Sequence, residues 1–558
     1  MSEGHPETIT VDFGLKGYYA IFVGMDTVAS NVQLRLNGDP TPDFLSSGQV
    51  VWSWRRRIDE LFWRVADMTD RKIEISKAKG VSAHNSSVAQ FCFLELTKEE
   101  YESIVADQRH TKNKRLNAVC DMDLLYLYGK RITEESWREL IKPTLDGDFD
   151  SYTFEDIYQR SSIEAFFKEK VAEERINGPW ERDCSYFKDI SLERYEELMR
   201  HIIKYGQENG LKMFVAIRAG LWELDAPADR GLVSDWFFTN NLDCMPIDRD
   251  GVKIKTLSLA FAKVQDWFIN RFIRLAELGA DGVELILTRT PITMLFEEPV
   301  CVRFREKFGF DPKKLPLCDE RLMEVKCDIF TEFMQRLRDA LNEKGYLNTK
   351  INLRCLFSLY DNKLQGIDLE RLAKAGLVDN IISYPLIQRE RNIAEVKDED
   401  GLVDVAKYTE YLRTNDGLRM NDRQDHSGPN DLFFIPPSEN FYGELVGPKT
   451  QAERIQEFVA IGKKYNVTVY FDLLPRDISP QRAKKYLREY YDNGAEKFSL
   501  WDSYSRWNLY KKFCFLKRVG HKEELFKSGT GKGVFYKQYK LIRIDDFNLV
   551  RYLGAWGG

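Results

Sequence analysis

The segment GADGVELILTRTPITMLFEEPV (residues 279–300) joins a short apolar run to a cluster of charged residues. Residues 282–288 are mostly apolar, as expected for a strand with both faces buried. Arg289 follows at once, and a proline-containing loop then brings Glu297 and Glu298. A buried strand that ends in charged residues is typical of the carboxyl edge of a parallel sheet, where barrel enzymes place their chemistry.

Seven other segments resemble this strand, and helical patterns alternate with them. One helical pattern runs from Ser191 to Gly210 and another from Ser258 to Gly279, each with serine as the expected N-cap and glycine as the stop. Eight strands that alternate with helices predict an α/β fold, the (β/α)8 TIM barrel. The predicted strands are residues 115–126, 150–156, 211–220, 282–289, 350–357, 378–385, 467–475 and 497–503.

The length of 558 residues allows a large barrel with appended parts. Residues 1–110 contain short β-rich runs between turn formers, which predicts a β-sandwich accessory domain that either binds carbohydrate or acts as a lid or interface. The barrel is predicted to span 111–525. The β-like segment 526–558 is predicted to pack on the N-terminal domain, because chain termini often lie close together. Within the barrel, 388–430 fits a loop or an insertion, and 431–437 is a possible extra strand.

The composition excludes several classes of protein. The chain is 43% hydrophobic and 30% charged, which indicates a globular protein, and its net charge of −6 argues against nucleic acid as the main partner. The nine cysteines form no CxxC pair, so neither a disulfide framework nor a zinc site is expected. Aromatic residues make up 13% of the chain, which fits either sugar-binding faces or a large aromatic core.

The start of the chain lacks the basic and apolar pattern of a signal peptide, which predicts a cytoplasmic protein, or a periplasmic or secreted one if the sequence is trimmed. No run of eighteen apolar residues is present, so no membrane span is expected. The oligomeric state is left open.

Polar residues gather at the predicted carboxyl ends of the strands. Asp121 and Asp123 would share one face of their strand, but two acids without further ligands do not make a metal site, and neither a metal nor another cofactor is expected. No histidine lies at a strand end and no glycine-rich phosphate loop follows the last strands. Carboxylates, arginines and aromatic residues together fit glycoside chemistry. The candidate residues are Arg218, Trp222, Glu223, Arg289, Arg354, Tyr384, Asp472, Arg476, Trp501, Asp502 and Arg506.

Among the acids, Glu297 is the predicted general acid, because the neighbouring Phe296 would desolvate its carboxyl group and raise its pKa. Glu298 is assigned to the start of the following helix, where a carboxylate favours the helix dipole. Asp472 is the predicted nucleophile or base, with Asp502 in reserve. A structural role for Glu297 within its loop is an equally weighted alternative.

The arginines at the strand ends have two interpretations. They bind an acidic or sulfated sugar, because the guanidinium fork matches carboxylate and sulfate groups, or they pair internally with Asp121, Asp472 and Asp502.

Several motifs along the chain resemble the family-10-like glycosylhydrolases, a group of bacterial barrel proteins. They are YAIFVGM, LAELGADGVELILTRTP, FEEPVCVRFREKFGFDP, DNKLQGIDLERLAKAGLVDNII, DLLPRDISP, NGAEKFSLWDSYSR and GHKEELFK. The resemblance covers most of the chain, and it implies a TIM barrel with an appended β domain and a carbohydrate substrate. Barrel glycosidases commonly have Asn-Glu after strand four and a glutamate after strand seven, whereas this chain has Thr288-Arg289 and Asp472. The prediction is therefore a glycoside hydrolase, with a non-hydrolytic carbohydrate-binding barrel as the main alternative and a lyase for acidic sugars as a more distant one.

Overall fold

The computed structural model describes most of the N-terminal half of the chain and most of the barrel. The described residues are 7–26, 31–39, 42–46, 58–77, 88–108, 113–120, 134–145, 147–156, 192–219, 237, 240–249, 251, 253, 256–288, 293–384, 449–473, 487–502 and 519–522.

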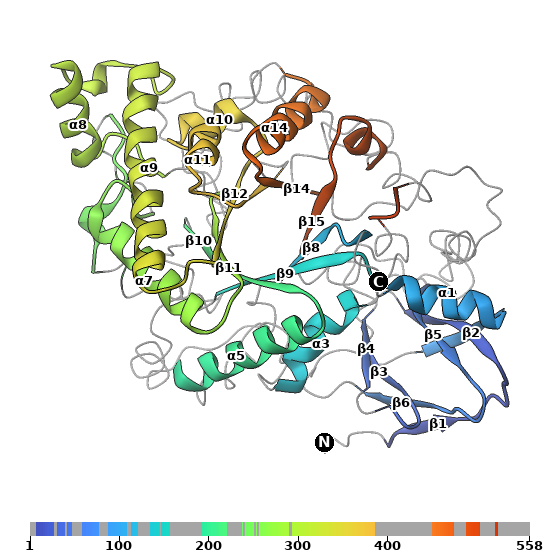
Figure 1. Ribbon diagram of the computed structural model, residues 1–558. Coiled ribbons are helices and arrows are strands. Elements are labelled where there is room, and N and C mark those ends of the chain that lie inside the picture. Colours follow the sequence, from blue (N-terminus) through green and yellow to red (C-terminus); the bar gives the residue numbers. More distant parts are fainter. Residues whose placement is uncertain are drawn as a thin grey trace, which may run out of the picture.

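Eight parallel strands close into a barrel in the order β10-β11-β12-β13-β14-β15-β8-β9 (Figure 1). The strand β8 pairs with β9 on one side and with β15 on the other, which closes the barrel. Each of the eight strands lies within one predicted segment, give or take one residue, so the predicted (β/α)8 TIM barrel is confirmed. The strands are β8 (Leu116–Cys120), β9 (Phe149–Glu155), β10 (Lys212–Arg218), β11 (Gly282–Ile286), β12 (Lys350–Leu356), β13 (Asn380–Tyr384), β14 (Thr468–Asp472) and β15 (Lys497–Asp502).

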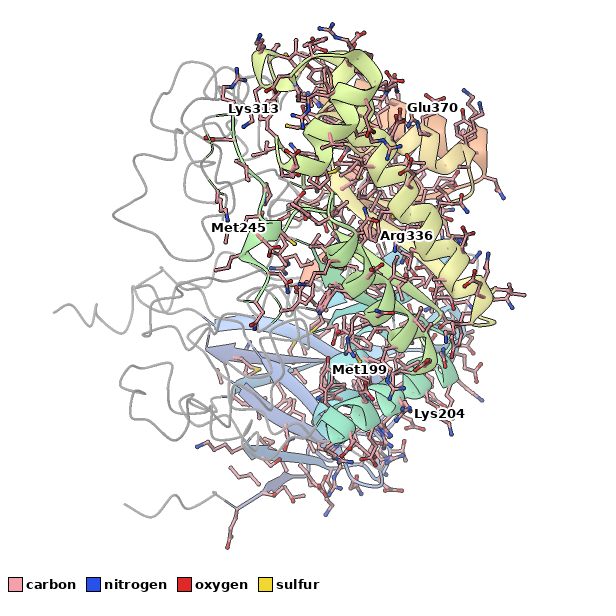
Figure 2. All side chains as sticks on the ribbon, turned by 90° about the vertical axis from the view of Figure 1, so that its left-hand side faces the viewer. Met199, Lys204, Met245, Lys313, Arg336 and Glu370 are labelled. Carbon is pink, nitrogen blue, oxygen red and sulfur yellow. The ribbon has the colours of Figure 1, made fainter. Side chains whose placement is uncertain are left out.

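Helices surround the barrel and bury their apolar faces against it (Figure 1). In Figure 2, for example, Met199 of α5 is buried in the core, whereas Lys204 of the same helix lies on the outer surface. The helices are α3 (Glu134–Leu145), α5 (Leu192–Glu208), α7 (Ala262–Glu277), α8 (Glu298–Phe308), α9 (Glu320–Glu343), α10 (Leu359–Leu364), α11 (Leu369–Lys374) and α14 (Gln451–Tyr465), with short 3-10 helices η5 (Leu242–Cys244) and η6 (Pro312–Lys314).

The ends of these helices follow local sequence signals in most cases. Thr450 and Glu453 form a reciprocal capping box at the start of α14, which ends at Asn466 in the left-handed conformation. The prediction that Ser258 caps α7 is wrong, because α7 begins at Ala262 and its N-cap is Phe261. The hydroxyl group of Ser258 is used in a tertiary contact, which is described below.

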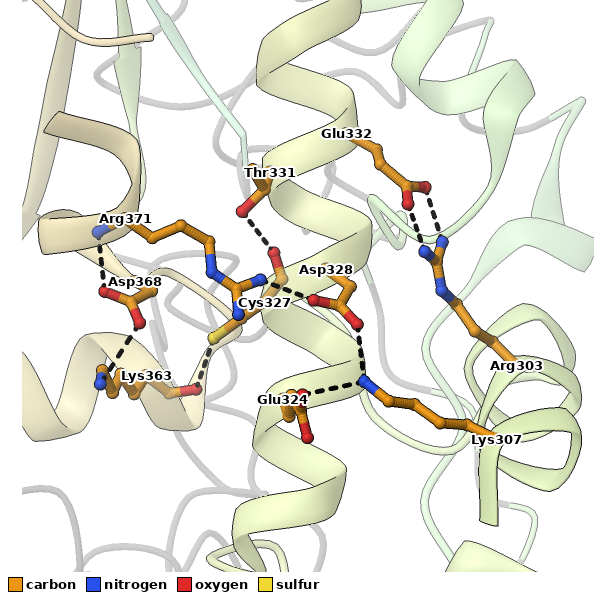
Figure 3. Close-up of polar contacts among 10 residues, drawn as sticks. All are labelled: Arg303, Lys307, Glu324, Cys327, Asp328, Thr331, Glu332, Lys363, Asp368 and Arg371. Carbon is orange, nitrogen blue, oxygen red and sulfur yellow. Dashed lines mark hydrogen bonds and ion pairs between the residues drawn. The ribbon is translucent and has the colours of Figure 1, made fainter. Parts of the chain in front are cut away.

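The outer helices α8, α9 and α11 are joined by ion pairs (Figure 3). Arg303 of α8 pairs with Glu332 of α9. Asp328 of α9 receives both Lys307 of α8, at 3.1 Å, and Arg371 of α11, at 2.6 Å. Such exposed pairs each stabilise a protein by at most about 1 kcal/mol, so they fix the relative position of these helices more than the stability of the fold.

The N-terminal region forms two antiparallel sheets. One has the order β1-β6-β3-β4 and the other β5-β2-β7, and apolar residues of both sheets, including Val23, Leu34 and Trp63, share one core. The strands are β1 (Ile9–Val11), β2 (Tyr18–Asp26), β3 (Asn31–Leu36), β4 (Asp43–Ser46), β5 (Ile58–Asp67), β6 (Ile73–Lys77) and β7 (Val88–Leu96), and helix α1 (Lys98–Gln108) follows them.

A buried histidine connects this region to the barrel. The His521 ring contacts Asp107 of α1 through Nε2, at 2.9 Å, and Asp148, which precedes β9, through Nδ1, at 2.7 Å. The domain boundary at residue 110 stays a prediction. The predicted features at 388–430, 431–437 and 526–558 lie outside the described residues. Among the described helices, none has both the length and the apolar character that a membrane span requires.

Candidate active site

The interior of the barrel contains a set of buried polar side chains, which we call the lumen cluster. Its position follows from the alternation of side chains along each strand. In β11, Val283 and Leu285 point outward into the apolar core under the helices, so Glu284 between them points into the barrel. Each member is at most 2% exposed. The lumen cluster consists of Asn117, Ser151, Thr153, Glu284, Arg354, Asp472 and Ser499.

Arg354 of β12 is the centre of the lumen cluster. Its Nε donates to Oε1 of Glu284 at 2.7 Å, and its Nη1 donates to Oδ2 of Asp472 at 2.8 Å. Its Nη2 donates to Oγ of Ser499 at 3.2 Å. One guanidinium group thus joins two carboxylates. Glu284 comes from β11, which is next to β12 in the strand order, and Asp472 comes from β14, which lies beyond β13 on the other side.

Weaker hydrogen bonds extend this network to β8 and β9. The Thr153 hydroxyl donates to Oε2 of Glu284 at 3.3 Å. The Asn117 amide donates to the Thr153 hydroxyl at 3.0 Å and accepts from the Ser499 hydroxyl at 3.3 Å. The network therefore closes on itself through β8, β9, β11, β12 and β15, with Asp472 joined to it through Arg354.

Within the lumen cluster, the two carboxyl groups of Glu284 and Asp472 contact one guanidinium group, that of Arg354. Burial by itself would lower the pKa of Arg354, but the charges of Glu284 and Asp472 outweigh it, and the pKa of the guanidinium is raised. Arg354 is therefore a permanent cation between two buried carboxyl groups.

A second buried ion pair lies at the carboxyl ends of β9 and β10. Nη2 of Arg218 donates to Oε2 of Glu155 at 2.6 Å, and both side chains are almost completely buried. For Arg218 and Arg354, the two predicted arginines that the structure describes, internal pairing is thus the interpretation that the contacts support. Of the three predicted partners, Asp472 takes part in it, whereas Asp121 and the side chain of Asp502 lie outside the described part of the structure.

The predicted acid Glu297 lies away from the lumen cluster, at the N-cap of α8. Its Oε1 accepts a hydrogen bond from the Ser258 hydroxyl and its Oε2 accepts one from the Leu295 amide at 2.9 Å. The side chain is fully buried, and burial raises its pKa, as predicted. Glu298 lies in the first turn of α8, as predicted, and pairs with Arg305 at 3.0 Å.

These contacts give Glu297 a measurable effect on stability. Its pKa is raised in the folded state, so the folded protein holds this proton more tightly than the unfolded chain. The contribution of Glu297 to the free energy of unfolding is therefore fully present at low pH. It is lost as the pH rises from the pKa of Glu297 in the unfolded chain towards its higher pKa in the folded protein. We expect Glu297→Gln, which stays neutral, to weaken this decline in stability between acidic and neutral pH, measured by thermal unfolding at several pH values.

Glu297→Ala serves as the matched comparison. It leaves the Ser258 hydroxyl and the Leu295 amide without their acceptor, which should lower the free energy of unfolding by about 1–3 kcal/mol. Equal unfolding curves for wild type and both variants at every pH would contradict the structural role of Glu297.

The remaining predicted residues are placed only in part. Tyr384 ends β13 and is 5% exposed. Trp501 and Asp502 end β15, where only their backbone is described. No group of metal-binding side chains occurs among the described residues. The predicted residues that lie outside the described part of the chain are Asp121, Asp123, Trp222, Glu223, Arg289, Arg476 and Arg506.

Two carboxylates of the interior were missed by the sequence analysis. Glu284 interrupts an apolar strand, and Glu155 follows Ser151 and Thr153 at two-residue spacing. A polar residue on the inward face of a barrel strand is the signal that identifies both, once the face that lines the lumen is known.

No protein-family model matches this sequence, and no curated protein matches it. Solved structures that this chain matches include an α-galactosidase from Thermus thermophilus, with 12% identity, a TM-score of 0.35 and 92% of each chain covered. The glycoside hydrolase domain of PelA from Pseudomonas aeruginosa has 11% identity and a TM-score of 0.29, with 55% of this chain and 84% of that chain covered. The citrate synthase SbnG has 10% identity and a TM-score of 0.25, with 74% of this chain and 95% of that chain covered.

Proposed function

We propose that this protein is a glycoside hydrolase that uses Asp472 as one of two catalytic carboxylates. The observation that carries the proposal is the position of Asp472 at the carboxyl end of β14, where barrel enzymes place catalytic residues, together with its contact to Arg354. A carboxylate that attacks a sugar or activates water must be ionised, and an adjacent arginine favours that state.

In the proposed reaction, Asp472 acts at the anomeric carbon while an acid protonates the leaving oxygen. As a nucleophile, Asp472 forms a glycosyl ester that water then cleaves. As a base, it takes a proton from the attacking water. The two routes need carboxyl groups about 5–5.5 Å and about 6.5–9.5 Å apart, respectively, and they give opposite stereochemistry at the anomeric carbon.

The acid is the less defined part of the proposal. Glu297 has the raised pKa that a general acid requires, but both of its oxygens accept hydrogen bonds, from the Ser258 hydroxyl and from the Leu295 amide. The proposal therefore depends on Asp472, and Glu297 remains the proposed acid on the strength of its pKa alone. Asp502 remains the reserve for Asp472.

The substrate is proposed to be an oligosaccharide or polysaccharide, with an acidic or sulfated sugar as the finer proposal. Arg218 and Arg354 are already paired with carboxylates. A preference for anionic sugars therefore depends on the other three arginines, Arg289, Arg476 and Arg506.

The test is to incubate the purified protein with neutral, uronate-containing and sulfated glycans and to measure new reducing ends. Release of reducing ends supports the proposal, and NMR of the first product identifies the stereochemistry. Binding of a glycan without release favours the non-hydrolytic alternative. Equal rates on a neutral glycan and on its uronate counterpart would contradict the preference for acidic sugars.

A further inference from the structure

We propose that Arg354 is a positioning residue, which acts through Asp472 and is controlled by Glu284 on its other side. This inference rests on the proposed function, because it assigns Arg354 a role in the action of the same carboxylate. It replaces the role that the sequence predicted for Arg354, which was a contact with the substrate.

The contacts of Arg354 leave it badly placed to bind a sugar. Its Nε, Nη1 and Nη2 each donate to a different protein group. Two of these acceptors are carboxylates, so a substrate that displaced either one would break an ion pair between completely buried groups. Such a loss is far more costly than the hydrogen bond that the sugar would provide.

The same contacts fix the direction in which Asp472 points. A guanidinium group is planar, and the angles between its N–H donors are fixed. The hydrogen bonds of Arg354 to Glu284 and Ser499 therefore constrain the position of its third acceptor, Asp472. Glu284 and Ser499 are themselves held by Thr153 and Asn117. Side chains of β8, β9, β11 and β15 therefore hold Arg354 in place, and Arg354 in turn orients the carboxylate of Asp472 at the end of β14.

The charges around Asp472 act in opposite directions. Arg354 favours the ionised carboxylate, whereas Glu284, a like charge on the far side of the guanidinium, disfavours it. On β14 itself the other described titratable side chain is Tyr470, two residues before Asp472 and on the same face. On the neighbouring strands they are Tyr384, at the end of β13, and Lys497, at the start of β15, which pairs with Asp150. Burial raises the pKa of Tyr470, and the nearby charge of Asp150 raises it further, so Tyr470 stays neutral at ordinary pH.

This arrangement predicts shifts of opposite sign in two variants. Arg354→Lys keeps the positive charge but loses the fork of donors, so the acid limb of the pH–rate profile should move to higher pH. Glu284→Gln removes the competing negative charge but keeps an acceptor for Nε, so the acid limb should move to lower pH. Misalignment of Asp472 in Arg354→Lys should also lower kcat by about 100-fold, while KM changes little.

Arg336→Lys is the matched control, because Arg336 pairs with Asp266 on the outer surface and should leave the profile unchanged. Carboxyl NMR of aspartate-labelled protein gives a second measurement, with the Asp472 signal assigned by its loss in Asp472→Asn. This measurement reports the ionisation of Asp472 whether or not a substrate is known.

The outcomes separate this inference from the proposed function. Opposite shifts of the Asp472 titration in Arg354→Lys and Glu284→Gln support the positioning role, even if no glycan is cleaved and the proposed function fails. Shifts in the same direction, or no shift, would overturn the inference even in an active hydrolase. A rise in KM with kcat unchanged in Arg354→Lys would also overturn it, because that result indicates a substrate contact.

Discussion

Replacing Arg354 with methionine should lower the free energy of unfolding by about 3–5 kcal/mol, because it removes one partner of a buried ion network and leaves the other charges in place. Glu284 and Asp472 are both fully buried, and both pair with Arg354. Methionine fills a similar volume, so the loss would come from the uncompensated carboxylates and not from a cavity. Chemical unfolding followed by circular dichroism measures the difference.

Two comparisons show whether charge is the cause. Arg336→Met removes an arginine of an exposed pair and should change the stability by at most about 1 kcal/mol. The triple variant Glu284→Gln, Arg354→Met, Asp472→Asn contains no ionised group at these positions and should recover much of the stability that Arg354→Met loses. If the triple variant is as unstable as Arg354→Met, packing and not charge explains the effect.

Much of the fold was predictable because it depends on local patterns. Most barrel strands are short and largely apolar, and these features do not depend on which strands become neighbours. The segment 282–289 shows this, since its apolar residues alone identify β11. Eight such segments that alternate with helices have few other ways to bury both faces of their strands.

The partners of the polar residues were not predictable in the same way. Arg354 contacts Glu284, 70 residues earlier, and Asp472, 118 residues later. Which inward residues meet across the lumen depends on the stagger of the strands in the closed barrel, and the sequence does not state that stagger. The sequence could therefore place Arg354 and Asp472 at strand ends, but it could not choose between a substrate contact and internal pairing.

Ser258 shows how a tertiary contact can replace a local one. A serine before a helical pattern is a strong N-cap signal, and α7 does begin four residues later, at Ala262. The hydroxyl group instead donates to Glu297, 39 residues away. Because that carboxylate is buried, a hydrogen bond from the Ser258 hydroxyl stabilises the protein more there than at a solvent-accessible helix end. Helix α7 therefore starts without a side-chain cap.

Replacing Asp472 with asparagine should lower kcat by about 10²–10⁴-fold on any glycan that the wild type cleaves, because the amide can act neither as nucleophile nor as base. The fold should be retained. Asparagine has the same shape and keeps an oxygen that can accept from Nη1 of Arg354, while Glu284 still balances the charge of the guanidinium. KM should change little if Asp472 acts mainly in the transition state.

Asp379→Asn is the matched control for this variant. Asp379 precedes β13 at the opposite end of the barrel, where it accepts from Arg338 at 2.6 Å and from the Ile351 amide at 2.9 Å. Burial acts to raise the pKa of Asp379, but these hydrogen bonds and the nearby cations outweigh it and hold the pKa below its usual value. Its replacement should therefore reduce stability at neutral pH and leave turnover intact.

Loss of turnover in Asp472→Asn alone, at an unchanged melting temperature, would place the chemistry at the carboxyl end of β14. Full turnover in Asp472→Asn would instead exclude Asp472 and make Asp502 the carboxylate to test, because it ends the neighbouring strand β15 at the same end of the barrel.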